Sequence, residues 1–81
     1  MKKTIQYKFV EDCTSCVSYE LLYAKIDKIV NMLRTYGLEV TCTNIEYKNN
    51  RYYCCVNVIK SGLFPSKKEI DVLVGKKGIY I

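Results

Sequence analysis

The chain has 81 residues, a length that supports one small hydrophobic core and excludes an enzyme of two domains. Hydrophobic residues make up 49% and charged residues 26% of the sequence, as in folded globular proteins and unlike disordered segments. The net charge is +5, and the absence of His removes the commonest general base and every Ser-His or Cys-His catalytic pair. We therefore expect one domain, residues 1–81, that is not an enzyme unless a pair of thiols does redox chemistry.

The first half of the chain predicts a strand followed by a long helix. Apolar and polar residues alternate over 4–10, which is the period of a half-buried strand. A helix is expected to begin within 14–19, because apolar residues then recur at spacings of three and four. Gly37 follows as a C-terminal cap that ends this helix. The expected buried stripe consists of Tyr19, Leu22, Ile26, Ile29, Leu33 and Tyr36.

The middle of the chain predicts two strands joined by a tight turn. Alternation over 38–47 changes phase near Asn44, which indicates a bulge in the first of them. Asn49-Asn50 is a turn signal, because Asn tolerates the left-handed backbone that short hairpins need. Residues 51–60 are apolar on both faces, so this strand is expected at the centre of the sheet.

The last part of the chain predicts a short helix and a terminal strand. The helix opens at Pro65 or Ser66 and ends at Gly75, and residues 79–81 are apolar enough for a strand. The order of elements is therefore βαββαβ. It predicts an α+β, ferredoxin-like fold in which two helices cover one face of a four-stranded antiparallel sheet. A thioredoxin-like fold is the alternative.

Positive charge is concentrated in the second half of the chain. Acidic and basic residues balance over 1–46, whereas 47–81 carry seven basic residues against Glu69 and Asp71, which accounts for the whole net charge of +5. A surface of one sign favours an acidic partner: a nucleic acid, a nucleoprotein or an acidic protein face. The residues that we expect to contact such a partner are Lys48, Arg51, Tyr53, Lys60, Lys67 and Lys68.

No segment reads as a membrane span or as a secretory signal. Lys2 and Lys3 are followed by Gln6, Tyr7 and Lys8, where a signal needs a continuous apolar stretch. No window approaches the roughly 18 apolar residues that a spanning helix needs. A cytoplasmic protein with no membrane partner is the expectation.

The motif Cys13-Thr14-Ser15-Cys16 lies at the junction of the first strand and the first helix. Two thiolates at this spacing can converge on one soft cation, and a helix N-terminus favours their deprotonation. Here the chain resembles the heavy-metal-associated domains, ferredoxin-like carriers of copper and zinc. The resemblance extends to Val17 and to Gly78-Ile79-Tyr80, while Glu11 stands where that family has Met. It implies that Cys13 and Cys16 are ligands of one copper or zinc ion.

The same two thiols have other interpretations. A redox dithiol is one, and Gly62-Leu63-Phe64-Pro65 resembles a stretch of the thioredoxin-like proteins of the selenoprotein W type. The neighbouring Glu11 and Asp12 disfavour a reactive thiolate, because carboxylates raise a thiol pKa. The third interpretation is structural, since a free Cys often packs as a small hydrophobic residue. Cys42 and Cys54 are expected in the core.

The strand over 51–60 also has features of a nucleic-acid surface. Arg51 and Tyr53 match in part the basic and aromatic octamer with which RNA-recognition domains of this topology stack bases. We expect a small monomeric or dimeric binding protein that contacts an acidic macromolecule. It would be a regulator or inhibitor of the kind that phages and mobile elements encode. Soft-metal carriage and thiol redox chemistry are the alternatives.

Overall fold

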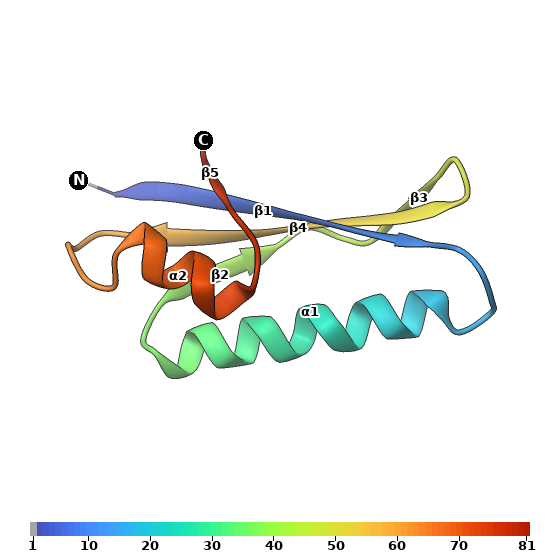
Figure 1. The fold of residues 1–81 in the computed structure, drawn as a ribbon, viewed down its shortest axis with the longest axis horizontal. Helices are drawn as coiled ribbons and strands as arrows, with labels where there is room; N and C mark the ends of the chain where they lie inside the picture. Colours follow the sequence, from blue (N-terminus) through green and yellow to red (C-terminus); the bar gives the residue numbers. More distant parts are fainter. Residues whose placement is uncertain (1) are drawn as a thin grey trace.

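The computed structural model describes residues 2–81, and every element that the sequence predicts is present (Figure 1). Both helices are followed by a glycine with left-handed backbone, Gly37 at φ 81° and Gly75 at φ 84°. Within residues 2–81, no helix has the length and hydrophobicity needed to cross a membrane. In chain order the elements are β1 (Lys3–Asp12), α1 (Ser18–Thr35), β2 (Glu39–Cys42), β3 (Glu46–Lys48), β4 (Arg51–Lys60), α2 (Lys67–Val74) and β5 (Ile79–Tyr80).

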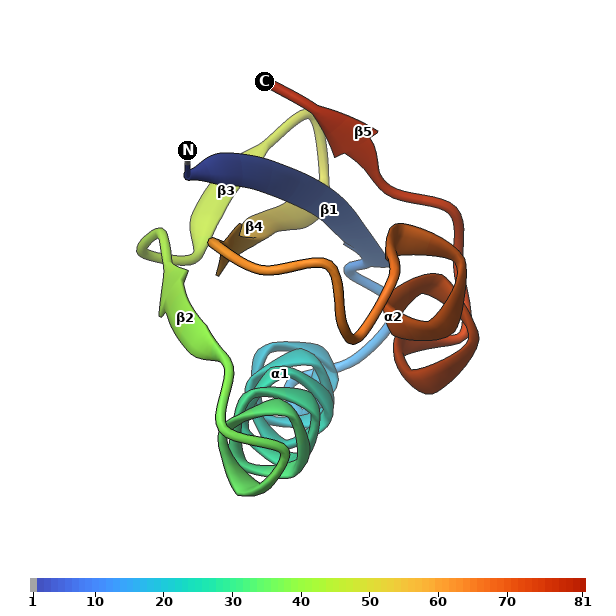
Figure 2. The same cartoon turned by 90° about the vertical axis from the view of Figure 1, so that its left-hand side faces the viewer.

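The strands form one antiparallel sheet with β4 at its centre, as its two apolar faces predict. The order across the sheet is β2-β4-β1-β5, and β3 pairs with the part of β4 that β2 leaves uncovered. Both helices pack against the same face of the sheet (Figures 1 and 2). The expected α+β class is confirmed.

The sheet has five strands where four are expected, because the second strand is interrupted at 43–45. Cys42 pairs with Val56 and Glu46 pairs with Tyr53, so four steps along one strand face three along β4. One extra residue is therefore accommodated at the place where the sequence indicates a bulge. It shifts the register of β3 by one residue and divides the strand into two.

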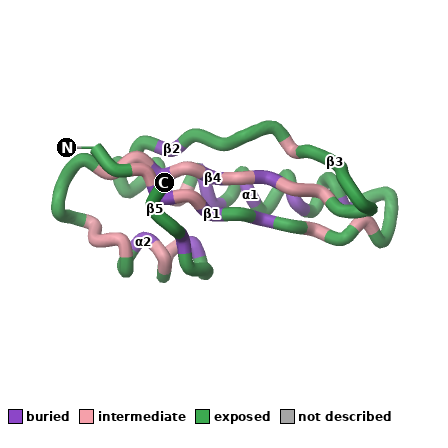
Figure 3. The backbone as a smooth tube through the Cα atoms, turned by 90° about the horizontal axis from the view of Figure 1, so that it is seen from above, coloured by how far each residue is buried: buried purple, intermediate pink, exposed green. Residues whose placement is uncertain are grey.

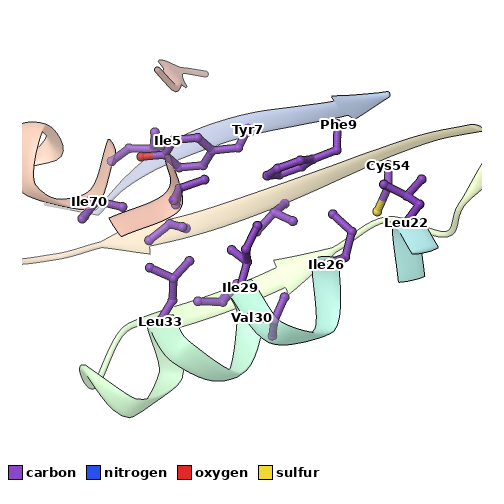
Figure 4. Close-up of a cluster of buried hydrophobic side chains, with 14 residues drawn as sticks. Ile5, Tyr7, Phe9, Leu22, Ile26, Ile29, Val30, Leu33, Cys54 and Ile70 are labelled. Carbon is purple, nitrogen blue, oxygen red and sulfur yellow. The ribbon is translucent and has the colours of Figure 1, made fainter. Parts of the chain in front are cut away.

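The hydrophobic core lies between the sheet and the two helices (Figures 3 and 4). Inward residues of β1 and β4 pair directly, Tyr7 with Val56 and Phe9 with Cys54. The central four residues of the predicted helix stripe are buried, and Cys54 is in the core as predicted. The core consists of Ile5, Tyr7, Phe9, Leu22, Ile26, Ile29, Val30, Leu33, Val40, Cys54, Val56, Val58, Ile70 and Val74.

Three residues expected in the core are exposed. Tyr36 follows the last residue of α1 as its C-cap and is 59% exposed. Tyr19 stands on the first turn of α1, where its ring packs edge-on against Tyr52 at 5.6 Å between centroids and keeps one side in solvent. Cys42 is at the end of the edge strand β2, which β4 covers on one side only. The expectation that Cys42 is a core residue is therefore wrong.

Candidate functional site

The central strand separates the predicted contact residues into two groups. Lys48 and Arg51 flank the turn Asn49-Asn50, whereas Lys60 ends β4 on the opposite side of the molecule. β4 has 10 residues, so these ends lie about 30 Å apart at the usual rise of a strand. The structure therefore brings Lys60 close to Lys67 and holds Lys48 and Arg51 elsewhere.

The loop of residues 61–66 connects β4 to α2 at one end of the molecule (Figure 1). A basic cavity lies there, lined by residues of β1, β4, β5, α2 and this loop. Its volume is about 490 Å³. Three lysines and two serine hydroxyl groups line it, and no carboxylate is among the lining residues. These residues, which we call the basic cavity, are Lys3, Lys60, Ser61, Gly62, Leu63, Ser66, Lys67 and Tyr80.

The lysines of the basic cavity are held in different ways. The Nζ atom of Lys3 lies 5.4 Å from the centroid of the Tyr80 ring, a cation–π contact that leaves its charge uncompensated. The Nζ atom of Lys60 donates to the carbonyl oxygen of Gly62 in the loop. Lys67 differs from both, because its Nζ atom forms an ion pair with Asp71 at 2.8 Å.

Asp71 is the centre of a polar network behind the cavity. One of its carboxylate oxygens accepts from the hydroxyl group of Tyr7 at 2.6 Å and from the backbone N–H of Gly78 at 3.1 Å. Its other oxygen accepts from Lys67. Desolvation raises the pKa of Asp71, but the hydrogen bonds from Lys67, Tyr7 and Gly78 outweigh it and hold this pKa below its usual value. The carboxylate is therefore charged and joins α2 to β1.

The N-terminus of α2 lies beside the basic cavity. Ser66 is its N-cap, as the sequence predicts, and its hydroxyl oxygen accepts from the N–H of Glu69 at 3.3 Å. Lys68 is exposed on the first turn, next to the ion-paired Lys67. The spacing of four between Lys67 and Asp71 on a helix was the signal that could have revealed this ion pair from the sequence.

The remaining contact candidates lie near the hairpin end. Arg51 forms an ion pair with Asp12 at 2.9 Å between Nε and Oδ1, which neutralises part of its charge. Tyr53 is half-buried and pairs with Val10, so it belongs to the sheet face opposite the helices. Lys48 is exposed on β3. These residues do not join the basic cavity.

The Cys-x-x-Cys motif lies in the loop that leads into α1, two residues before the helix begins. Cys16 is exposed, and Cys13 is half-buried with its thiol 4.0 Å from the hydroxyl oxygen of Tyr52. The hydrogen bond with Cys13, followed by desolvation, raises the pKa of Tyr52. No group of three or more His, Cys, Asp or Glu residues placed to hold a metal ion occurs within residues 2–81.

Ser18 organises this loop in a way that the sequence did not indicate. Its buried hydroxyl oxygen accepts from the N–H groups of Thr14 and Ser15 at 3.1 and 3.2 Å. Ser18 is the first residue of α1, but its side chain caps the turn that precedes the helix. The loop is thus folded back on the helix start.

The other cysteines are part of the sheet. Cys54 and Cys55 point to opposite faces of β4, as adjacent strand residues must, and Cys54 is buried. Desolvation raises the pKa of Cys54, and its thiol donates to the carbonyl oxygen of Thr43 at 3.3 Å. All five cysteines of the chain are free thiols.

Comparisons with protein-family models, with curated proteins and with solved structures give no significant match.

Proposed function

We propose that the protein is a non-enzymatic binding protein that contacts an acidic macromolecule through the basic cavity and the adjoining Lys68. The observation that carries this proposal is the convergence of Lys3, Lys60 and Lys67 on one cavity with no carboxylate in its lining. Lysines gathered in a concave site raise the local potential, which attracts and orients a polyanion. Serine hydroxyl groups beside them can donate to phosphate or carboxylate oxygens.

The free charge of this site comes from three lysines. Lys67 is compensated by Asp71, so Lys3, Lys60 and Lys68 supply the attraction. Such a site suits a nucleic acid, a nucleoprotein or an acidic protein face as its partner. A small regulator or inhibitor works by contact of this kind. Five free thiols agree with the reducing cytoplasm, which we propose as its location.

A ferredoxin-like topology is part of the same proposal. When β2 and β3 are treated as one interrupted strand, the order of elements is strand, helix, two strands, helix, strand. The last strand then lies beside β1 at one edge of the sheet, and the interrupted strand lies at the other. This order supports the ferredoxin-like arrangement, in which one sheet face is left open for contact.

The proposal is tested by reversing charge at one end of the molecule and not at the other. The variant Lys60→Glu/Lys68→Glu should weaken binding to duplex DNA, RNA or polyglutamate by about tenfold or more. The control variant Lys48→Glu, which changes charge at the hairpin end, should bind as the parent does. For duplex DNA the logarithm of affinity should fall with the logarithm of salt by about 0.9 per neutralised phosphate.

If neither these polymers nor an anionic surface binds, or if all variants bind alike, the basic cavity has no role in contact. Circular dichroism of each variant must match that of the parent, so that a loss of binding reports on charge and not on unfolding.

A soft-metal carrier is the second proposal, supported by two free thiols in one short loop. Cys13 and Cys16 would be the ligands. Thiolates select Cu(I) and zinc among biological metals, and tetrahedral zinc needs two more ligands than this loop supplies. Cu(I) is therefore the metal of choice for the test.

A further inference from the structure

The loop tip Leu63-Phe64 is the most exposed apolar feature of the molecule. Leu63 is 84% and Phe64 is 81% exposed, the highest values among the large hydrophobic residues that the structure describes. Exposing two adjacent apolar side chains of this size to water is unfavourable in free energy. Neither of them belongs to the hydrophobic core. The tip lies between β4 and α2, at the end of the molecule where the chain begins (Figure 1).

This apolar tip adjoins both the basic cavity and further apolar surface. Leu63 itself lines the basic cavity beside Lys60. On the other side, Pro65 lines a hollow of about 410 Å³ together with Tyr36 and Val72, which is 75% exposed. Apolar groups lie at the centre of this surface, and its margin carries Lys60 and Lys68 together with the carboxylates of Glu39 and Glu69. Amphipathic surfaces of this kind bind at the boundary between lipid headgroups and hydrocarbon.

We propose that the acidic partner of this protein is an anionic lipid bilayer surface, into which Leu63 and Phe64 insert. This inference rests on the proposed function, because the lysines of the basic cavity and Lys68 would lie at the level of the lipid phosphates. The hydroxyl groups of Ser61 and Ser66 would donate to phosphate oxygens there. The loop would reach the boundary between the lipid headgroups and the acyl chains, while the rest of the domain stays outside the bilayer.

Two properties of the tip favour a bilayer over the other polyanions. Leu63 is aliphatic and cannot stack on a base, whereas hydrocarbon accepts Leu and Phe equally. More than four-fifths of both side chains is in solvent. A projecting apolar tip of this kind can insert into the hydrocarbon interior of a bilayer, whereas the surface of a polyanion offers it no apolar environment. The expectation of no membrane partner followed only from the lack of a spanning segment, and surface contact needs none.

The test is flotation of the intact protein with vesicles of phosphatidylcholine, with and without phosphatidylserine. The parent should bind only when phosphatidylserine is present, and added salt should weaken the binding. The variant Leu63→Ser/Phe64→Ser should lower vesicle binding about tenfold or more. The matched control Leu21→Ser removes a side chain that is 58% exposed on α1 and should leave binding unchanged.

The variants distinguish this inference from the proposed function. Lys60→Glu/Lys68→Glu should lower binding to vesicles, whereas Leu63→Ser/Phe64→Ser should lower binding to vesicles alone and not to DNA or polyglutamate. Binding to a polymer without binding to vesicles would overturn the inference that the partner is a bilayer, and would leave the proposed function in place. Vesicle binding that the Leu63→Ser/Phe64→Ser variant retains would also overturn it. Binding to none of these probes would overturn both.

Discussion

Gly78 lies directly against the ring of Tyr7. A Cβ atom on Gly78 would stand 2.6 Å from Cε1 and 2.7 Å from Cζ of that ring. The N–H of Gly78 and the hydroxyl group of Tyr7 also donate to the same oxygen of Asp71. Because β5 follows Gly78 at once, this close approach sets where the last strand meets β1.

The variant Gly78→Ala should therefore destabilise the fold. The added methyl group would also meet Ile5 at 2.6 Å, and overpacking of this kind costs about 1–3 kcal/mol. Gly62→Ala is the matched control, since the nearest atom to its Cβ would be 3.9 Å away. Urea denaturation of both variants measures the difference in free energy of unfolding. If the free energy of unfolding of Gly78→Ala equals that of the parent, the contact of Gly78 with Tyr7 and Ile5 has room for a methyl group.

Tyr7 should make the protein sensitive to alkali. Burial, followed by the hydrogen bond to Asp71, raises the pKa of Tyr7 far above its ordinary value of about 10. Below about pH 10 both folded and unfolded chains keep this proton, and above it only the folded chain does. The free energy of unfolding should thus fall as the pH rises past about 10.

The variant Tyr7→Phe tests this pH dependence. It keeps the buried ring and removes the ionisable group, so its stability should decline less steeply above about pH 10 than that of the parent. Tyr36→Phe, at an exposed position, should keep the parent slope. Equal slopes in all three proteins would assign the alkaline loss to other groups.

Neighbouring lysines on α2 should respond differently to charge reversal. The side chains of Lys67 and Asp71 are 22% and 19% exposed, and they are paired, whereas Lys68 faces solvent. Lys67→Glu removes the ion pair and places two carboxylates together, which should cost about 1–3 kcal/mol of stability. Lys68→Glu should change stability by less than about 0.5 kcal/mol. Thermal unfolding of the two variants compares them, and equal melting temperatures would contradict the network described for Asp71.

The inward stripe of α1 should be essential for stability. Ile26 is 5% exposed and packs in the core, so Ile26→Ala should cost about 2–5 kcal/mol. Leu21→Ala on the exposed side of the same helix is the control and should cost far less. The measurement is the midpoint of denaturant unfolding. A fully stable Ile26→Ala variant would place the stripe in solvent.

The thiols of Cys13 and Cys16 provide a further test. If they bind a soft metal, the reduced protein should take up one equivalent of Cu(I) in competition with a coloured chelator. Cys13→Ser and Cys16→Ser should each abolish this uptake, whereas Cys55→Ser on the sheet should retain it. Uptake by the variant that lacks both Cys13 and Cys16 would assign the ligands to other cysteines.

The sequence predicts the elements well because each has a local cause. The glycine caps, the Asn pair and the phase change near Asn44 all act within a few residues, and the structure shows each of them. Burial at the ends of α1 was beyond such reasoning, because the exposure of Tyr19 and Tyr36 depends on which parts of the chain pack against each end of the helix. The basic cavity could not be predicted from local sequence patterns either. Lys3 and Tyr80 reach it only through the pairing of strands from opposite ends of the chain.

The incomplete cover of β1 leaves part of a sheet edge open to pairing with another strand. Among residues 2–81, β5 pairs with β1 only at Ile5 and Gln6, so the later half of that edge offers unpaired backbone groups. Lys76 folds over this edge: its ammonium group donates to the carbonyl oxygen of Lys8 and lies 4.8 Å from the Phe9 ring centroid. A strand from a second molecule would have to displace a hydrated charge before it could pair there. The position of Lys76 therefore disfavours the addition of a strand at this edge.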